Sequence, residues 1–162
     1  MKTSGMTAMT HIAQLNIGLF RYPTDDPRMA AFMTNLDRIN ALAERSEGFV
    51  WRLKDESNNA TAIRPENDPN MAVNLSVWES VEALERFVWA TVHKQFYNRK
   101  GGWFEPLSKP HFVMWPIPAG HLPDVEEAMG RLAHLTSRGD SDYAFGWSHL
   151  AHIKLWMSRQ CG

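Results

Sequence analysis

The sequence predicts an α+β fold of the ferredoxin-like βαββαβ kind, in which an antiparallel sheet carries its helices on one face. Two strand patterns support this prediction, because apolar and polar residues alternate through residues 10–20 and 72–78. Two helix patterns follow them, since residues 27–45 and 81–96 repeat apolar side chains every three or four positions. The chain has 162 residues, which suits one domain with a single core.

The first strand, the first helix and the second strand occupy residues 10–53. The apolar row of the first strand is Ala13, Leu15, Ile17 and Leu19, and its second row is Gln14, Asn16 and Gly18. Asp26 is placed to cap the helix, and Pro27 suits the first helical position. Gly48 comes where a helix would stop, so residues 49–53 are predicted as a short strand.

The third strand, the second helix and the last strand occupy residues 72–116. One side of the third strand holds Asn74, Ser76 and Trp78. Ser80 caps the helix that follows, and the apolar stripe of that helix ends before Gly101. Pro110 and Pro118 bound the last strand.

The domain organisation follows from these elements. Residues 1–9 are predicted to be a flexible N-terminus and residues 10–120 the ferredoxin-like domain. Residues 121–162 are predicted to be a C-terminal helical extension, because residues 124–137 carry an amphipathic stripe. The pattern assigns no structure or role to residues 140–162.

One sheet face is expected to need a second chain as its cover. An antiparallel sheet with helices on one side leaves the other side bare. The row expected on that bare side is Asn16, Asn74, Ser76 and Trp78. Since dimers are the commonest oligomers, we expect a homodimer that forms a dimeric α/β barrel.

Composition and charge exclude several classes of protein. The net charge is −1 and no basic face is evident, which argues against nucleic-acid binding. No apolar run approaches the roughly 20 residues that span a bilayer, and the N-terminus lacks a signal-peptide core. A soluble, cytoplasmic protein is therefore expected. The lone Cys161 excludes an internal disulfide or a cysteine-based zinc site.

Motifs for metal, nucleotide and hydrolase chemistry are also missing. His149 and His152 are three residues apart, but no third metal ligand accompanies them. There is no glycine-rich phosphate loop, nucleophile-elbow serine or paired carboxylate motif. We therefore predict no metal and no nucleotide.

Several segments resemble a bacterial domain family of unknown function in the dimeric α/β-barrel superfamily, related to antibiotic-biosynthesis-monooxygenase-like proteins. The segments are HIAQLNI at 11–17, DDPRM at 25–29, GFVWRL at 48–53, VNLSVWES at 73–80, His93, WFEP at 103–106 and WPIPAG at 115–120. The resemblance covers about residues 10–145, and the stretch after Gly146 departs from it. Its superfamily includes cofactor-independent monooxygenases of aromatic substrates, haem-binding enzymes and lactone isomerases, so the fold alone does not name the chemistry.

Three polar residues are the candidate catalytic groups. His93 falls where related proteins often place a histidine that faces the cavity, and it would serve as general acid or base, or as a haem ligand. The alternative is a structural histidine at a helix C-terminus. Asn16 and Asn74 lie mid-strand, where asparagine is rare, and would orient a ligand oxygen or make hydrogen bonds across a dimer interface.

Aromatic residues are the candidate walls of a cavity for a flat ligand. They are Trp51, Trp78, Phe87, Trp103, Phe104 and Trp115. The alternative is that these side chains form ordinary core. Arg52 alternates with Trp51, so only one of the two faces the cavity, and Arg52 there would favour an anionic ligand.

Three functions remain open from the sequence. The first is a cofactor-independent monooxygenase-like enzyme that acts on a flat apolar molecule, with His93 moving a proton while Asn16 and Asn74 hold an oxygen. The second is a haem protein with His93 as ligand. The third is a non-catalytic binding or structural dimer.

Overall fold

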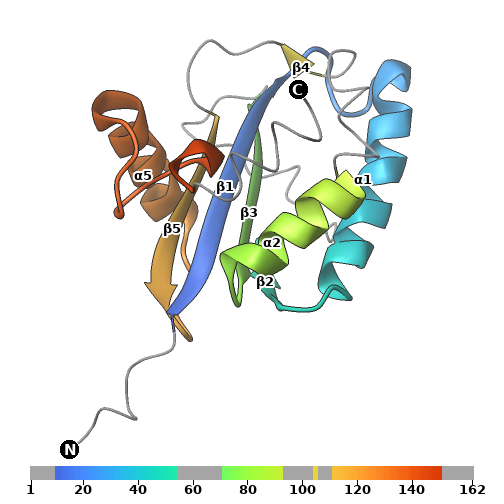
Figure 1. Ribbon diagram of the computed structural model, residues 1–162. Coiled ribbons are helices and arrows are strands. Elements are labelled where there is room, and N and C mark those ends of the chain that lie inside the picture. Colours follow the sequence, from blue (N-terminus) through green and yellow to red (C-terminus); the bar gives the residue numbers. More distant parts are fainter. Residues whose placement is uncertain (1–9, 55–70, 93–103, 106–110, 151–162) are drawn as a thin grey trace, which may run out of the picture.

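A five-stranded antiparallel sheet forms the centre of the computed structural model, which describes residues 10–54, 71–92, 104–105 and 111–150 (Figure 1). Its strands are β1 (Thr10–Phe20), β2 (Phe49–Arg52), β3 (Met71–Trp78), β4 (Phe104–Glu105) and β5 (Phe112–Pro118). β1 is central, with β3 on one side and both β5 and the short β4 on the other. The order β5-β1-β3-β2 is that of a ferredoxin-like sheet, so the predicted α+β class is confirmed.

The first two helical segments begin where the sequence predicted caps at Asp26 and Ser80. The helices are η2 (Pro27–Met29) leading into α1 (Ala30–Glu44), α2 (Val81–Phe87) continuing as the π-helical turn η4 (Val88–Val92), α5 (Val125–Arg138) and the short η6 (Trp147–His149). Asp26, Ser80 and Asp124 each accept a hydrogen bond from a main-chain N–H in the first turn. None of the helices in the described ranges is long and apolar enough to cross a membrane.

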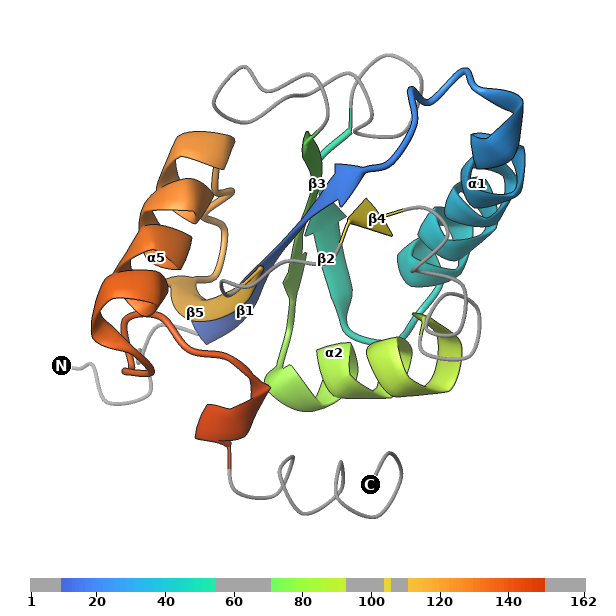
Figure 2. The ribbon, with the colours of Figure 1, turned by 90° about the horizontal axis from the view of Figure 1, so that it is seen from above.

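The apolar row of β1 faces α5. This side of the sheet holds the buried core residues Ala13, Leu15, Val73, Leu75, Val77, Val113, Trp115 and Ile117, against Ala128, Leu132 and Leu135 of α5. Figure 2 shows α5 on one side of the sheet and α1 with α2 on the other. The helix predicted as part of an extension is therefore a layer of the core.

The second row of β1 faces α1 and α2, and the prediction of a bare face for it is wrong. Ile12, Trp78 and Met114 from the sheet are buried there against side chains of both helices. The helix residues in this cluster are Ile39, Ala43, Ala83, Leu84 and Phe87. Alternation shows which residues share a face, but it does not show which face the helices choose.

Gly48 lets the turn after α1 approach α2 closely. Its φ of 86° lies in the left-handed region, and a Cβ there would collide with the side chain of Ala83. The main-chain oxygen of Gly48 also accepts a hydrogen bond from Glu79 N at 2.7 Å. This contact fixes where α2 starts above the sheet.

Candidate functional site

Three rows of side chains cross the sheet face that carries α1 and α2, called the polar face below, and the β1 and β3 residues of these rows become exposed only in the third. Strand pairing places Trp78, Ile12 and Pro116 in the first row, Ser76, Gln14 and Met114 in the second, and Asn74, Asn16 and Phe112 in the third. Gln14 and Ser76 are buried beneath the helices. Asn16 and Asn74 are exposed, so the face opens at the third row.

A chain of hydrogen bonds runs from the buried row to the open one. Trp78 Nε1 donates to Ser76 Oγ at 2.9 Å, and Gln14 Nε2 donates to the same oxygen at 2.8 Å. Gln14 Nε2 also donates to Asn74 Oδ1 at 2.7 Å. A buried, connected network of this kind holds its members in defined orientations.

Asn16 and Asn74 form a pair of carboxamides in the middle of the sheet, and this pair is the centre of the candidate site. They are direct cross-strand partners, so their Cβ atoms lie about 5 Å apart. The next row beyond them is Gly18 and Ala72, and Ala72 packs against the buried cluster of Phe20, Met29 and Phe32. Among the described residues, no hydrogen-bond partner is found for the Asn16 side chain.

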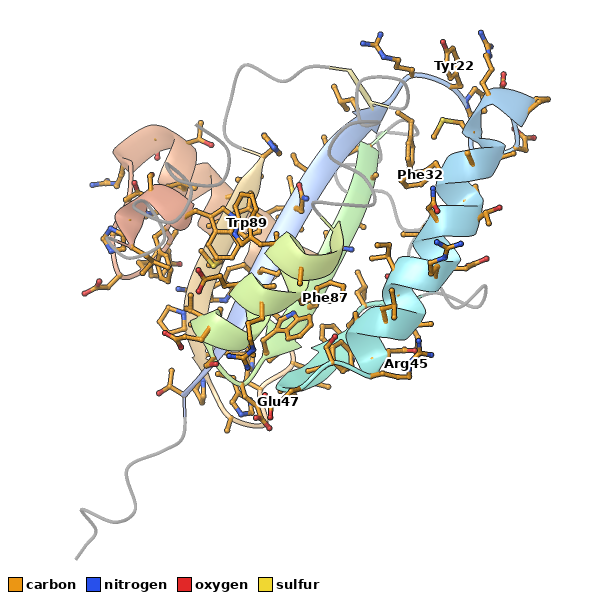
Figure 3. The ribbon with its side chains drawn as sticks, turned by 45° about the vertical axis from the view of Figure 1, so that its right-hand side comes forward. Tyr22, Phe32, Arg45, Glu47, Phe87 and Trp89 are labelled. Atoms are coloured by element: carbon orange, nitrogen blue, oxygen red, sulfur yellow. The ribbon has the colours of Figure 1, made fainter. Side chains whose placement is uncertain are left out.

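An aromatic wall borders the amide pair on the β5 side. Phe112, the cross-strand partner of Asn16, stacks on Trp147 of η6 with centroids 5.2 Å apart and planes 12° apart. Trp89 lies 6.5 Å from Trp147, and it extends from the α2 side towards β5 (Figure 3). All three rings are half-buried. A flat ligand on the amides would therefore meet aromatic edges or faces along one side.

Trp78 and Phe87 lie at the closed end of the polar face. Their rings stack 5.1 Å apart, and Phe49 meets Trp78 edge-on at 5.4 Å. Trp78 is only 1% exposed, so it forms the floor beneath α2 and does not reach the open row. Its part in the site is the hydrogen bond to Ser76.

Three other sequence candidates do not line the open row. Trp51 pairs with Val77 and packs on the apolar face, while Trp115 is fully buried there and donates from Nε1 to Glu127 at 3.0 Å. Arg52 does lie on the polar face, but its Nε is 3.1 Å from the Glu44 carboxylate of α1. Because a carboxylate already balances its charge, Arg52 gives no reason to expect an anionic ligand.

The remaining candidates fall on segments without described side chains. His93 and Trp103 lie outside the described residues, so the general-base and haem-ligand hypotheses for His93 stay predictions. The backbone of Phe104 pairs with Phe20 at the far end of β1. Within the described part of the chain, no three His, Cys, Asp or Glu side chains gather as a metal site would require.

A separate shallow hollow lies outside the site around Asn16 and Asn74, between the turn after α1 and helix α2. It measures about 200 Å³ and is lined by Ser46, Glu47, Ala83, Arg86, Phe87 and Ala90. Figure 3 labels Glu47 and Phe87 of this hollow. Its two charged residues pair with each other, with Arg86 Nη2 3.3 Å from Glu47 Oε1, and both are well exposed. An exposed pair of this kind adds little binding energy.

Comparison with known protein families identifies one that matches most of the chain. The family described as a domain of unknown function, DUF3291, matches residues 11–160. The chain belongs to this family. No curated protein matches it. Family membership confirms the predicted resemblance to a family of unknown function and leaves the activity of this DUF3291 protein to be argued from its site.

Solved structures with a similar arrangement are distant in sequence. SnoaB, a cofactor-independent oxygenase from Streptomyces nogalater, is 16% identical over 69% of this chain and 95% of its own, with a TM-score of 0.42. A conserved protein from Methanosarcina mazei is 11% identical over 68% and 93%, with a TM-score of 0.43. A protein of unknown function from Nitrosomonas europaea is 13% identical over 72% and 98%, with a TM-score of 0.43. These likenesses are too distant to assign an activity.

Sequence reasoning missed the aromatic wall of this DUF3291 protein. It placed Asn16 and Asn74 on one face, and the structure brings them together. The sequence could have predicted Phe112 at the site, because antiparallel pairing of the first and last strands puts it beside Asn16. It could not have predicted Trp89 and Trp147, since they are 58 positions apart (147 − 89) and meet only through the tertiary fold.

Proposed function

We propose that this DUF3291 protein binds a flat, mostly apolar molecule over the Asn16–Asn74 pair and oxidises it with dioxygen, without a bound cofactor. The observation that carries the proposal is the pair of exposed carboxamides, side by side in mid-sheet and bordered by Phe112 and Trp147. Amide groups bind an oxygen atom of the ligand, while the aromatic rings contact its apolar body. The resemblance to monooxygenase-like proteins supports the choice of reaction class.

The chemistry needs only a substrate that forms an electron-rich anion. A CH₂ group beside a ring conjugated to a carbonyl loses one proton, and the charge moves to the carbonyl oxygen. The anion gives its electrons to dioxygen and forms a C–O bond; the resulting peroxide takes up a proton and loses water, leaving a second carbonyl. One oxygen atom enters the product and the other leaves as water.

The site of this DUF3291 protein favours that step because N–H groups near the anionic oxygen stabilise its charge. Such a donor contributes most when it is held in place before the reaction and shielded from water. The buried Gln14 supplies that fixed support beneath Asn74. The group that takes the proton is predicted from the sequence to be His93.

Oxygen uptake with anthrone tests the proposal. The purified protein should consume one dioxygen per anthrone and form anthraquinone, at a rate unchanged by EDTA. Asn74→Ala and Asn16→Ala should each lower kcat by roughly 10²-fold, the scale for loss of one oxyanion donor. Asn35→Ala, at a half-exposed position of α1, is the matched control and should keep full activity.

Two outcomes would contradict the proposal. Unchanged turnover in both amide variants would remove the pair from the chemistry. Absence of oxygen uptake by the wild-type protein, with anthrone bound, would exclude the oxygenase class and leave a binding protein.

A further inference from the structure

We infer that Gln14 is a positioning residue that turns the NH₂ group of Asn74 towards the open side of the site. The site then selects ligands that present a hydrogen-bond acceptor, such as a carbonyl or enolate oxygen, and rejects ligands that present only a donor. This inference rests on the proposed function and deepens it, because it names the group on the substrate that the site recognises.

Two contacts favour one direction for the hydrogen-bond chain. The indole of Trp78 only donates, so Ser76 Oγ accepts at that end. The main-chain oxygen of Asn74 only accepts, and it lies 3.4 Å from the nearer end of the Gln14 side chain. An amide oxygen at that end would face the main-chain oxygen directly, so the nitrogen is favoured there.

The two hydrogens of Gln14 Nε2 are used by the two short contacts. One goes to Ser76 Oγ at 2.8 Å and the other to Asn74 Oδ1 at 2.7 Å. Gln14 is 4% exposed and Ser76 is 7% exposed, so water does not offer a replacement. Turning Asn74 over would set one NH₂ group against another and replace the 2.7 Å bond of Gln14 Nε2 with its longer 3.4 Å contact to the Asn74 main-chain oxygen.

Asn74 consequently shows its two N–H donors to the open row. Among the described residues, no acceptor lies within hydrogen-bond distance of Asn74 Nδ2, and the side chain is exposed. An oxygen that gains negative charge during a reaction is the natural partner for such donors. A ligand that carries only an N–H group would meet donors instead and lose this contact.

Hydrogen exchange measured by NMR without a ligand tests the orientation of the Asn74 side chain. In the wild-type protein, the side-chain NH₂ of Gln14 should exchange its hydrogens slowly in NMR spectra, while that of Asn74 exchanges at least tenfold faster. In Gln14→Glu at neutral pH the carboxylate can only accept, so Asn74 should turn over and its NH₂ become protected. Equal exchange of Asn74 in both proteins would overturn the inference.

Two flat probes of similar size test the selectivity by calorimetry. Chromone presents a carbonyl acceptor and no donor. Indole presents one N–H donor, and its nitrogen lone pair does not accept a hydrogen bond. The wild-type protein should bind chromone at least tenfold more tightly than indole. Gln14→Glu should lose that preference at pH 7.5 and regain it at low pH, where a protonated carboxyl again donates.

Gln14→Leu is the control for a merely structural role. It should weaken the binding of both probes by the same factor, and this factor should not depend on pH. If Gln14→Glu behaves in the same way, or if wild-type protein binds chromone no better than indole, the inference is wrong. Should Gln14→Glu fail to fold, the exposed Asn74→Asp presents an oxygen in place of the NH₂ and should reverse the preference, whereas retained chromone preference would overturn the inference.

Failure of this inference is distinguishable from failure of the oxygenase proposal. Chromone has no CH₂ group to oxidise, so its binding is measured apart from turnover. Chromone preference without oxygen uptake on anthrone keeps the inference and removes the oxygenase. Oxygen uptake on anthrone without a preference for chromone keeps the oxygenase proposal and removes the inference about Gln14.

Discussion

Single residues in this protein act through the direction of their hydrogen bonds as much as through their position. Ser76 joins the network because its hydroxyl oxygen accepts from both Trp78 and Gln14. A hydroxyl at this point lets two donors end on one buried atom. A hydrogen-bond chain through Ser76 and Gln14 therefore links the exposed amide of Asn74 to a buried tryptophan four residues away along β3.

Asp26 makes similarly directed hydrogen bonds at the surface. Its protonation should make the stability of the folded state depend on pH. Its carboxylate accepts from Arg28 N at 2.8 Å and lies 2.9 Å from Arg28 Nη2, while the guanidinium sits 3.6 Å from the centre of the Tyr22 ring. The hydrogen bonds from the Arg28 side chain and main chain lower the pKa of Asp26 from 3.8 to about 2.

We expect Asp26 to stabilise the folded state above about pH 4 and to lose that effect as the pH falls towards 2. The folded state binds the Asp26 proton more weakly than the unfolded state does, so stability rises with pH across this window. The check is urea unfolding of wild type and Asp26→Asn between pH 2 and 6. Their difference in stability should be constant above pH 4 and shrink below it; a constant difference throughout would contradict the assignment.

At the scale of elements, the position of α2 over the sheet sets the boundary between the closed and open rows. Phe87 stacks on Trp78 at the closed end, and Trp89 in the following π-helical turn approaches Trp147 at the open end. π-helical turns often occur at functional sites, because the wider turn shifts the side chains that follow. The contact between Gly48 and Ala83 fixes the start of this helix.

Gly48→Ala should therefore destabilise the protein by roughly 2 kcal/mol or more, because a residue forced into left-handed backbone is strained and its Cβ collides with Ala83. Gly120 provides a matched control, since its φ is 94° but a Cβ there meets nothing within 4 Å. Gly120→Ala should carry the backbone strain alone, about 1 kcal/mol. Urea unfolding measures both, and equal losses would show that the approach to Ala83 is unimportant.

At the scale of the whole molecule, local patterns predicted the strands and helices, while packing decided what covers each sheet face. The alternation in β1 and the caps at Asp26 and Ser80 are local, and the structure confirms them. The apolar stripe of α5 was visible in the sequence, but nothing local shows that it packs on Leu15 and Leu75. Alternation placed Asn16 and Asn74 on one face, but the register that pairs them and the contacts of the aromatic wall come from the tertiary fold.

The same placement of helices changes the face on which we expect a dimer interface. Because α1 and α2 occupy the polar face, the expected partner surface is the apolar face beside α5 (Figure 2). Trp51 and Leu53 are half-buried there, at the β2 edge of the sheet and away from the strands β5 and β1 that α5 contacts. Half-exposed apolar side chains on an edge strand are suited to association with another chain.

We expect the wild-type protein to have twice the mass of its 18.5 kDa chain in light scattering, and Trp51→Glu to have the mass of one chain. A buried carboxylate opposite its own copy would leave two like charges unpaired in the interface. Leu122→Glu, at a position that is 53% exposed, should remain dimeric. Monomeric wild-type protein would refute the dimer, and a dimeric Trp51→Glu would move the interface away from β2.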